Sequence, residues 1–398
     1  MTHTLVPPKT FLAMVLILLL AGGCTLPTGE PTDPGSLQAT PPAAALETVP
    51  LPTDATTAAL LPHALYHLSA HSGSAQVWRL ERDGTTQTQI SFEDTDVLSF
   101  DVSPADGSVA FVSANQLYLV ESDGGNRRLL VDNAAADAQS ADYYFAQRLS
   151  DPLFSPDGRH LAYAYNGLWI LDLTTFQAVH VLGNQVRIRQ NGSTVLDGYY
   201  APRLWAPNGQ LLLLTVGDAQ TSQLAFLSPS AGAQVTPVES STVCCHAAWA
   251  PDSSSVMVAN PYIGLVNPGL WRYAAGSGEQ TALLAAEDEN EIHFAGWPLQ
   301  LTDGDLVYFY ATAAEVPEGD VPLYMVRSAA DGVSSRSQLR PDAFSNLIEV
   351  LWAGDGTLAL LVQSRPDGGP SGVVLLAGGD GRQLQLLLEN GYALKWGP

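Results

Sequence analysis

Residues 154–163 read Phe-Ser-Pro-Asp-Gly-Arg-His-Leu-Ala-Tyr, and they contain two apolar segments joined by a tight turn. Proline fixes φ at the first corner of a type I turn, aspartate caps the turn with its side chain, and glycine permits the backbone conformation that closes it. An apolar segment on each side of such a turn predicts a β-hairpin. This hairpin matters because related sequences recur along nearly the whole chain.

The turn has six further copies of varying strength. Clear copies are Ser103-Pro104-Ala105-Asp106-Gly107, Ala206-Pro207-Asn208-Gly209 and Ala250-Pro251-Asp252-Ser253, and weaker ones are Trp297-Pro298, Ala353-Gly354-Asp355-Gly356 and Trp396-Gly397-Pro398. If Ser103, Ser155, Ala206, Ala250, Trp297, Ala353 and Gly397 are equivalent, the steps are 52, 51, 44, 47, 56 and 44 residues. Repeats of roughly 40–50 residues with several strands each are typical of β-propeller blades.

Each repeat carries the strands of one blade. The turn at Ser103 is preceded by one apolar run and followed by three, at 109–112, 116–120 and 127–131. Four strands are the content of a propeller blade. The residue before the turn is usually aromatic, which predicts packing between neighbouring blades. The seven residues of this column are Val102, Phe154, Trp205, Trp249, Gly296, Trp352 and Trp396.

The two ends of the repeat region complete each other. Strands expected at 64–68, 76–80 and 86–90 lack an inner strand before them, and the strand at 392–396 lacks three strands after it. Together they make one blade, and closure of the ring removes exposed sheet edges. We therefore predict an all-β, seven-bladed β-propeller in which the C-terminal strand joins the N-terminal blade. Six or eight blades are the alternatives.

The first 61 residues precede the propeller. Residues 1–23 form a signal peptide, because the apolar run 11–20 is too short to span a bilayer and small residues follow it. Leu20-Ala21-Gly22-Gly23-Cys24 resembles the lipobox of bacterial lipoproteins, which implies lipidation of Cys24. An ordinary secretory signal is the alternative. Residues 24–61, rich in Pro, Thr and Ala, predict a disordered tether, and residues 62–398 the propeller.

The net charge and the cysteine content bear on the kind of partner and on disulfide formation. The formal charge is −23, from 40 acidic and 17 basic residues, which argues against nucleic acid as a partner. Besides Cys24 only Cys244 and Cys245 are present. Neighbouring strand residues point to opposite faces, so we expect two buried thiols, with a vicinal disulfide as the alternative.

The repeats resemble those of TolB-type propellers. The resemblance rests on the Ser-Pro-Asp-Gly hairpins and on segments such as Leu117-Tyr118-Leu119-Val120-Glu121-Ser122-Asp123-Gly124-Gly125, and it covers residues 62–398. It implies a periplasmic or cell-surface propeller that serves as a protein-binding platform. TolB itself has a separate α/β domain before its propeller, whereas this chain has a tether. The repeat carries no catalytic residues, so the resemblance implies none.

Long loops lie on one face of the predicted ring, and binding residues usually sit on loops held by a rigid scaffold. On this long-loop face, aromatic side chains stand beside carboxylates. The candidate binding residues are Tyr143, Tyr144, Phe145, Tyr199, Tyr200 and Tyr262. Tyrosine rings suit recognition of a protein, peptide or sugar because they bury much area at low entropic cost. Neutral insertions are the alternative.

A second candidate is a divalent metal site. Four residues before the assumed turn anchors of three successive blades stand His246, His293 and Glu349. Two imidazoles and a carboxylate suit a divalent metal ion. Polar residues that merely line a wet channel are the alternative, and otherwise no cofactor is expected.

Motifs of known enzymes are missing. The sequence contains no Gly-x-Ser-x-Gly, phosphate-binding loop, dinucleotide fingerprint or His-Glu-x-x-His. We expect a lipid-anchored, extracytoplasmic and monomeric propeller that binds an envelope protein, peptide or glycan. The membrane is reached through the N-terminal lipid only. The alternatives are a hydrolase or lyase acting on an extracellular sugar or peptide at the channel mouth, and a solute-sensing or structural role.

Overall fold

The structure is a computed structural model in which one compact unit spans Thr56–Pro398. It describes residues 59–138, 147–188, 190, 194–218, 221–229, 232–238, 246–261, 268–284, 291–315, 317, 319–365, 371–381 and 383–398. Short antiparallel strands make up this unit, because apolar runs alternate with turns at Gly, Asp and Pro along the sequence.

The strands form four-stranded blades. Blade 1 contains β4 (Val97–Val102), β5 (Val109–Ser113), β6 (Gln116–Val120) and β7 (Arg128–Asp132), and blade 2 contains β8 (Ser150–Phe154), β9 (His160–Ala164), β10 (Gly167–Asp172) and β11 (Gln177–Gly183). Blade 3 contains β13 (Thr194–Trp205), β14 (Leu212–Gly217), β15 (Ser222–Ser228) and β16 (Gln234–Pro237), with β12 (Gln185–Ile188) added to its edge. Blade 4 contains β17 (His246–Trp249), β18 (Ser255–Asn260), β19 (Gly269–Ala274) and β20 (Gln280–Leu284). Blade 5 contains β21 (Ile292–Gln300), β22 (Leu306–Ala313), β23 (Leu323–Ser328) and β24 (Ser337–Phe344).

The remaining strands build two blades that share one strand. Blade 6 contains β25 (Leu347–Trp352), β26 (Leu358–Ser364), β27 (Gly372–Gly378) and the first part of β28 (Gln385–Trp396). Blade 7 contains the last part of β28 with β1 (Leu65–Ser69), β2 (Gln76–Leu80) and β3 (Gln87–Gln89). Strand β28 pairs with β27 at Leu388 and with β1 at Trp396. The predicted seven blades, and their closure by the C-terminal strand, are confirmed.

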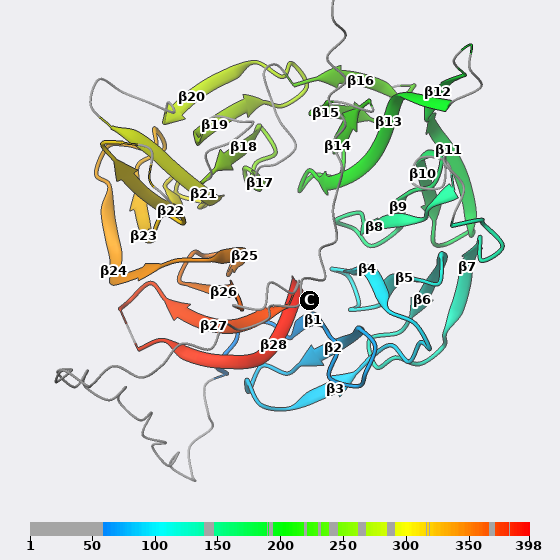
Figure 1. The fold of residues 1–398 in the computed structure, drawn as a ribbon, viewed down its shortest axis with the longest axis horizontal. Coiled ribbons are helices and arrows are strands. Elements are labelled where there is room, and N and C mark those ends of the chain that lie inside the picture. Colours follow the sequence, from blue (N-terminus) through cyan, green and yellow to red (C-terminus); the bar gives the residue numbers. More distant parts are fainter. Residues whose placement is uncertain are drawn as a thin grey trace, which may run out of the picture. The chain divides into compact units, whose positions relative to one another are not determined.

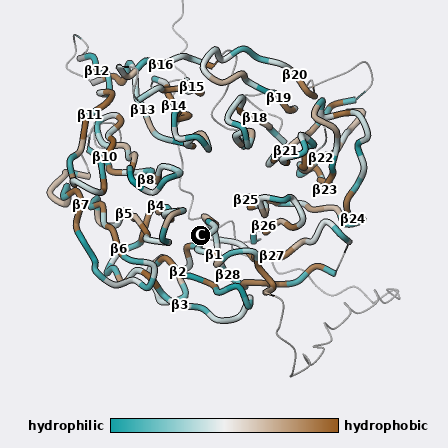
Figure 2. The backbone as a smooth tube through the Cα atoms, turned by 180° about the vertical axis from the view of Figure 1, so that it is seen from behind, coloured by the Kyte–Doolittle hydropathy of each residue, from teal (hydrophilic) through white to brown (hydrophobic). Residues whose placement is uncertain are grey.

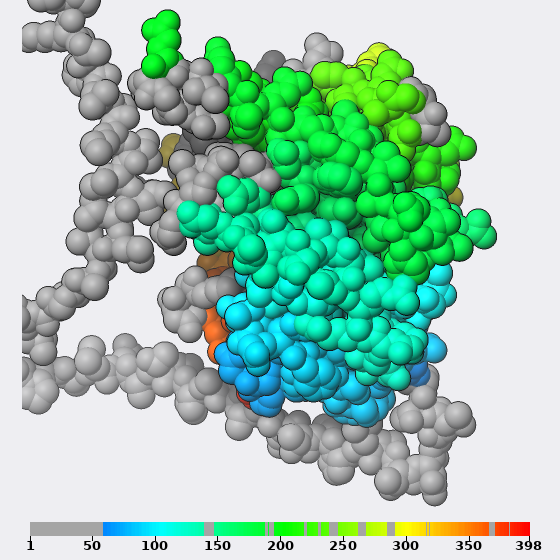
Figure 3. Space-filling model, turned by 90° about the vertical axis from the view of Figure 1, so that its right-hand side faces the viewer, coloured from blue at the N-terminus to red at the C-terminus, as the bar shows by residue number. Residues whose placement is uncertain are grey.

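The blades surround a common centre, with β4, β8, β17, β25 and β28 innermost and the fourth strands at the rim (Figure 1). Apolar residues concentrate within the blades (Figure 2), and the rim view shows blades 7, 1, 2 and 3 packed side by side in chain order (Figure 3). The core therefore consists of several clusters, each shared by two neighbouring blades, for example one that joins Phe226 of blade 3 to Trp249 of blade 4.

Tryptophans of the predicted packing column also join the blades by hydrogen bonds. Each indole Nε1 donates to a backbone carbonyl on the inner strand of the preceding blade. The pairs are Trp205 to Leu153 (3.3 Å), Trp249 to Leu204 (3.3 Å), Trp352 to Trp297 (2.7 Å) and Trp396 to Trp352 (2.7 Å). A buried indole N–H needs a hydrogen-bond acceptor, so the tryptophans of this column both pack between the blades and link them by hydrogen bonds.

The repeated turn has the predicted chemistry. In the turn of blade 2, Asp157 Oδ1 accepts a hydrogen bond from the backbone N of Arg159 (3.0 Å), and Ser155 Oγ donates to the same carboxylate (2.6 Å). Gly158 has φ +68°, and a Cβ there would lie 2.7 Å from Ala105 Cβ of the adjacent turn. Glycine is thus required both by its backbone conformation and by the close approach of blade 1.

The predicted turn of blade 5 is wrong. The chain turns at residues 301–305, where Leu301 N donates to Asp305 O (2.8 Å) and Asp303 Oδ1 accepts from Asp305 N (3.1 Å). Leu301, not Trp297, is therefore equivalent to Ala250 and Ala353. Trp297 lies upstream in β21, next to a register shift between Gly296 and Leu299, and its indole is buried. The sequence prediction followed the proline at position 298, whereas this turn uses Asp and Gly alone.

Candidate functional site

The connections between strands divide between two faces of the propeller. The repeated turns and the third-to-fourth strand turns lie on one face, which we call the motif-turn face. The second-to-third and fourth-to-first connections lie on the other, the long-loop face. Antiparallel order within each blade dictates this separation, because successive connections alternate between the two ends of the strands.

A pocket of about 570 Å³ opens at the long-loop end of blade 3. Tyr199 and Tyr200 line it, together with Asp197, Gln223 and the apolar residue Val216. Tyr199 and Tyr200 are half-buried, so each ring is held by the blade while part of it remains accessible. We call this the tyrosine pocket. Two of the six predicted aromatic binding residues therefore lie together in a cavity of ligand size.

The hairpin of β12 and β13 builds one wall of the tyrosine pocket. Strand β13 continues beyond the blade and pairs with β12, with Gly198 opposite Gln185. Arg187 Nη2 lies 2.9 Å from Asp197 Oδ1 across the hairpin. Asn184 Oδ1 accepts a hydrogen bond from the backbone N of Tyr200 (3.0 Å). These contacts fix the backbone at the two tyrosines before any ligand binds, which lowers the cost of binding.

The other predicted aromatic residues lie outside the described residues. These are Tyr143, Tyr144, Phe145 and Tyr262, and the same holds for Cys24, Cys244 and Cys245. Their predicted roles stay predictions. No helix in the described part of the chain is long and apolar enough to cross a membrane.

The predicted metal site is not formed. Across the described residues, no three His, Cys, Asp or Glu side chains lie close enough to hold a metal ion. The error follows from the misplaced turn of blade 5. Relative to the true turn at Leu301, the equivalent of His246 is Trp297, and the two rings stack with centroids 3.9 Å apart. Burial lowers the pKa of His246 to about 3, so this imidazole is neutral.

His293 and Glu349 also have partners of their own. His293 Nδ1 lies 2.9 Å from the hydroxyl of Tyr310 within blade 5. Glu349 Oε1 accepts a hydrogen bond from the backbone N of Leu394 (2.7 Å) and so joins blade 6 to blade 7. Burial raises the pKa of the Glu349 carboxyl above its usual value. Both side chains thus serve local structure.

An ion pair on the inner strands joins blade 7 to blade 1. Lys395 Nζ of β28 lies 3.1 Å from Asp101 Oδ1 of β4, and this carboxylate raises the lysine pKa. Asp101 Oδ2 also accepts a hydrogen bond from the backbone N of Phe154 (2.8 Å). One carboxylate therefore contacts blades 7 and 2 from blade 1. Since Lys395 is 38% exposed, solvent screening keeps the stabilisation by this ion pair modest, and the pair serves to position blade 1 against its neighbours.

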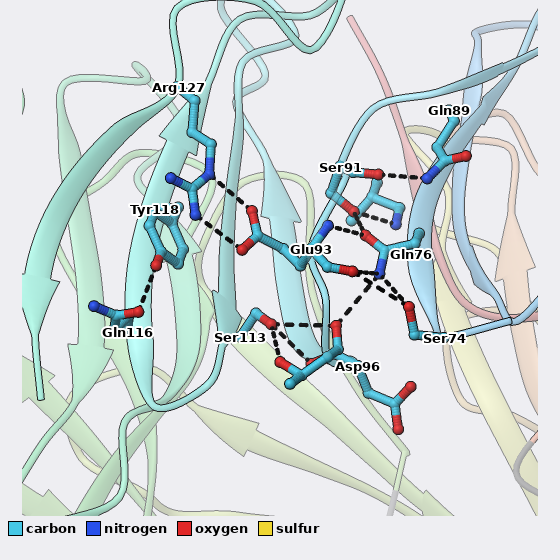
Figure 4. A network of polar contacts seen from close by, with 12 residues as sticks. Ser74, Gln76, Gln89, Ser91, Glu93, Asp96, Ser113, Gln116, Tyr118 and Arg127 are labelled. Atoms are coloured by element: carbon cyan, nitrogen blue, oxygen red, sulfur yellow. Dashed lines mark hydrogen bonds and ion pairs between the residues drawn. The ribbon is translucent and has the colours of Figure 1, made fainter. Parts of the chain in front are cut away.

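A polar network on the long-loop face holds the connection between blades 7 and 1 (Figure 4). Gln76 is its centre, with Oε1 accepting from Ser91 Oγ (2.8 Å) and from the backbone N of Glu93 (3.0 Å). Its Nε2 donates to Ser74 Oγ and to the carbonyl of Glu93, both at 2.9 Å. Arg127 forms two bonds to the Glu93 carboxylate, at 2.8 and 2.9 Å. Every polar atom of the Gln76 amide is used, so this part of the face is structural.

Sequence reasoning missed a pocket on the motif-turn face. A cavity of about 560 Å³ lies between the turns of blades 2 and 3, and it is lined by Pro156, Ile170, Trp205, Pro207 and Pro229. Two of these residues, Pro156 and Pro207, are the prolines of the repeated turns. The signal was present in the sequence as adjacent Ser-Pro-Asp-Gly and Ala-Pro-Asn-Gly turns, which were interpreted for the fold only.

Similar proteins are found through structure. No protein-family model matches the sequence. No curated protein matches it either. An oligogalacturonate lyase in complex with manganese is 12% identical, with 82% of this chain and 85% of that chain covered and a TM-score of 0.53. The oligogalacturonate lyase of Vibrio parahaemolyticus is 10% identical, with the same coverage and a TM-score of 0.52. TolB of Acinetobacter baumannii is 12% identical over 83% of this chain and 80% of that chain, with a TM-score of 0.42.

These likenesses concern the fold. The chain is an all-β propeller whose fold resembles that of the oligogalacturonate lyases, and a propeller scaffold serves many unrelated functions. At such low identities no substrate or reaction transfers from the lyases to this chain.

Proposed function

We propose that this chain is a β-propeller binding platform whose ligand is a protein, a peptide or a glycan and docks on the long-loop face. The tyrosine pocket carries the proposal. It combines two half-buried tyrosines, an exposed carboxylate at Asp197 and a backbone fixed by the β12–β13 hairpin. Tyrosine is enriched at recognition surfaces because its ring gives large contact area and its hydroxyl a directional bond.

The cellular setting is part of the same proposal. A lipid on Cys24 anchors the chain, residues 25–61 act as a tether, and the propeller faces the extracytoplasmic side as a monomer. The support for this setting is the Leu20–Cys24 sequence and the Pro-, Thr- and Ala-rich composition that follows it. Labelling of growing cells with a radioactive fatty acid tests it, since Cys24→Ser should abolish the label.

Affinity capture from the envelope fraction tests the binding role. The full chain is compared with the double variant Tyr199→Ala, Tyr200→Ala and with Tyr324→Ala, which removes a tyrosine that is 38% exposed on blade 5. We expect the double variant to bind the captured partner about 30-fold more weakly, because two central tyrosines commonly contribute 2 kcal/mol or more. Tyr324→Ala should bind normally. Equal binding by all three folded proteins contradicts the proposed site.

A further inference from the structure

A second pocket lies where the ring closes, on the long-loop face between blades 6 and 7. Its volume is about 590 Å³, and its lining includes Ser69, Trp78, Arg365, Leu387 and Asn390. It forms because β28 changes partners here, pairing with β27 up to Gly391 and with β1 from Tyr392 on. We call it the seam pocket.

Gly391 lets β28 make this change within a packed core. A Cβ at position 391 would lie 3.1 Å from Val374 Cγ2 and 3.4 Å from His67 Nδ1. The strand thus runs directly against blades 6 and 7, and the side chain of Asn390, next to this crossing, takes part in lining the pocket.

Polar atoms around the seam pocket are buried without partners. Among the residues that the structure describes, Trp78 Nε1, Asn390 Oδ1 and His67 Nε2 accept or donate no hydrogen bond. Trp78 and Asn390 line the pocket, and His67 lies opposite Trp78 in the pairing of β1 with β2. Buried donors and acceptors are nearly always satisfied in native proteins, so a cluster of unsatisfied ones indicates a missing partner.

His67 departs from the repeat at this place. In each blade, the residue that precedes the repeated turn pairs with a residue of the second strand. The residue two positions further along that second strand occupies an equivalent site in each blade. In blades 1, 2, 3, 4 and 6 this residue is apolar or aromatic: Phe111, Tyr163, Leu214, Val258 and Leu361. Blade 7 has His67, which is 1% exposed. A fold that needs only packing at this position gives no reason for an imidazole there.

We propose that the seam pocket binds an uncharged saccharide, with a pyranose ring against Trp78. Trp78 Nε1 is a donor and Asn390 Oδ1 an acceptor, and each sugar hydroxyl both donates and accepts. Leu387 and the indole supply apolar surface for the C–H face of the ring. Arg365 donates to the backbone carbonyl of Glu389, and Glu389 also lines the pocket, so the charges of these two side chains offset each other. The volume lies within the range of about 300–1,000 Å³ that small ligands occupy.

Calorimetric titration of the full chain with the methyl glycosides of glucose, galactose, mannose and N-acetylglucosamine tests this proposal. At least one glycoside should bind. Trp78→Phe keeps an aromatic ring but removes the donor, and Asn390→Leu removes the acceptor. Each should weaken binding about tenfold, the usual effect of losing one hydrogen bond to a ligand. Trp271→Phe is the matched control, because Trp271 pairs with Val258 as Trp78 pairs with His67, and it should bind as the wild type does.

The outcomes separate this site from the tyrosine pocket. Binding that survives Tyr199→Ala, Tyr200→Ala but weakens in Trp78→Phe and Asn390→Leu supports the seam pocket as an independent site. Thermal unfolding confirms that each variant is folded. The proposal is overturned if none of the four glycosides binds at millimolar concentration, or if a glycoside binds equally to wild type, Trp78→Phe and Asn390→Leu.

Discussion

Strand β2 carries two polar side chains, two residues apart on the same face, whose surroundings differ sharply. The Gln76 amide is 1% exposed and uses both its oxygen and its nitrogen in hydrogen bonds to Ser74, Ser91 and Glu93. In the part of the chain that the structure describes, Trp78 Nε1 has no partner at all. A buried polar group with its hydrogen bonds made fixes the path of the chain, whereas a buried donor or acceptor without a partner remains available to hydrogen-bond a ligand. The same face thus holds a structural region and a binding region.

The largest effect should come from breaking the structural region. Gln76→Leu removes the acceptor of the Ser91 hydroxyl and of the Glu93 backbone N–H, and one of the donors to the Glu93 carbonyl. Since each buried group left unsatisfied costs about 1–3 kcal/mol, the free energy of unfolding should fall by about 3 kcal/mol or more. Urea unfolding measures it. The exposed Gln177→Leu is the control, and a loss below about 1 kcal/mol for Gln76→Leu contradicts the structural role.

A second effect depends on pH and involves His67. Burial lowers its pKa to about 4 from an ordinary value of 6.5, so the folded protein holds this imidazole neutral. As the pH falls below 6.5 the unfolded chain takes up a proton first, and stability declines until the folded pKa is reached. The full loss is about 3 kcal/mol, from 2.5 pKa units at 1.36 kcal/mol each.

His67→Leu isolates this contribution. Other buried histidines, such as His246, act in the same direction, so the difference between variant and wild type is the informative quantity. Urea unfolding at about pH 7, 5.5 and 4 should show that His67→Leu loses less stability on acidification than the wild type. Parallel loss in both proteins excludes the assigned role of His67. At neutral pH the variant should be at least as stable, because five other blades have apolar or aromatic side chains there.

The fold could be predicted from sequence because the repeated turn is a local signal. Pro, Asp and Gly at fixed offsets set each hairpin, and seven copies set the ring. The one misplaced copy shows the limit of that signal. Leu301-Thr302-Asp303-Gly304 lacks a proline, and the nearby Trp297-Pro298 drew the assignment four residues upstream. That shift alone produced the predicted metal column of His246, His293 and Glu349.

The two candidate binding sites were harder to predict from the sequence than the fold. Tyr199 and Tyr200 could be proposed from the sequence because aromatic residues beside a carboxylate in a long loop are recognisable without a structure. The seam pocket was not found, since it brings Trp78 and Asn390 together through the change of partners of β28. The one indication of this pocket in the sequence is His67, a histidine within the apolar segment 64–68. A single histidine in an apolar strand does not by itself predict a pocket.

A smaller effect should come from the ion pair at the edge of the structural region. Arg127 is 49% exposed, and its partner Glu93 is 9% exposed. Exposed pairs contribute little, so Arg127→Gln should lower the free energy of unfolding by about 0.5–1 kcal/mol in dilute salt, and by less in about 1 M NaCl. Arg159→Gln, an exposed arginine in the turn of blade 2, should have no effect. A loss that does not change with salt contradicts an electrostatic origin.

The smallest loss of stability should come from the binding region. The same Trp→Phe substitution at Trp352 and at Trp78 compares an indole N–H that has a partner with one that has none in the described residues. Trp352→Phe removes an indole N–H that donates to the carbonyl of Trp297 at 2.7 Å, and its ring is buried, so we expect a loss of about 1–2 kcal/mol in urea unfolding. Trp78→Phe removes an N–H that makes no hydrogen bond in the described residues, and the ring is half-buried. Its loss should stay below about 0.5 kcal/mol. Equal losses would mean that the Trp78 N–H already has a partner within the folded chain, and the distinction between the two regions would then disappear.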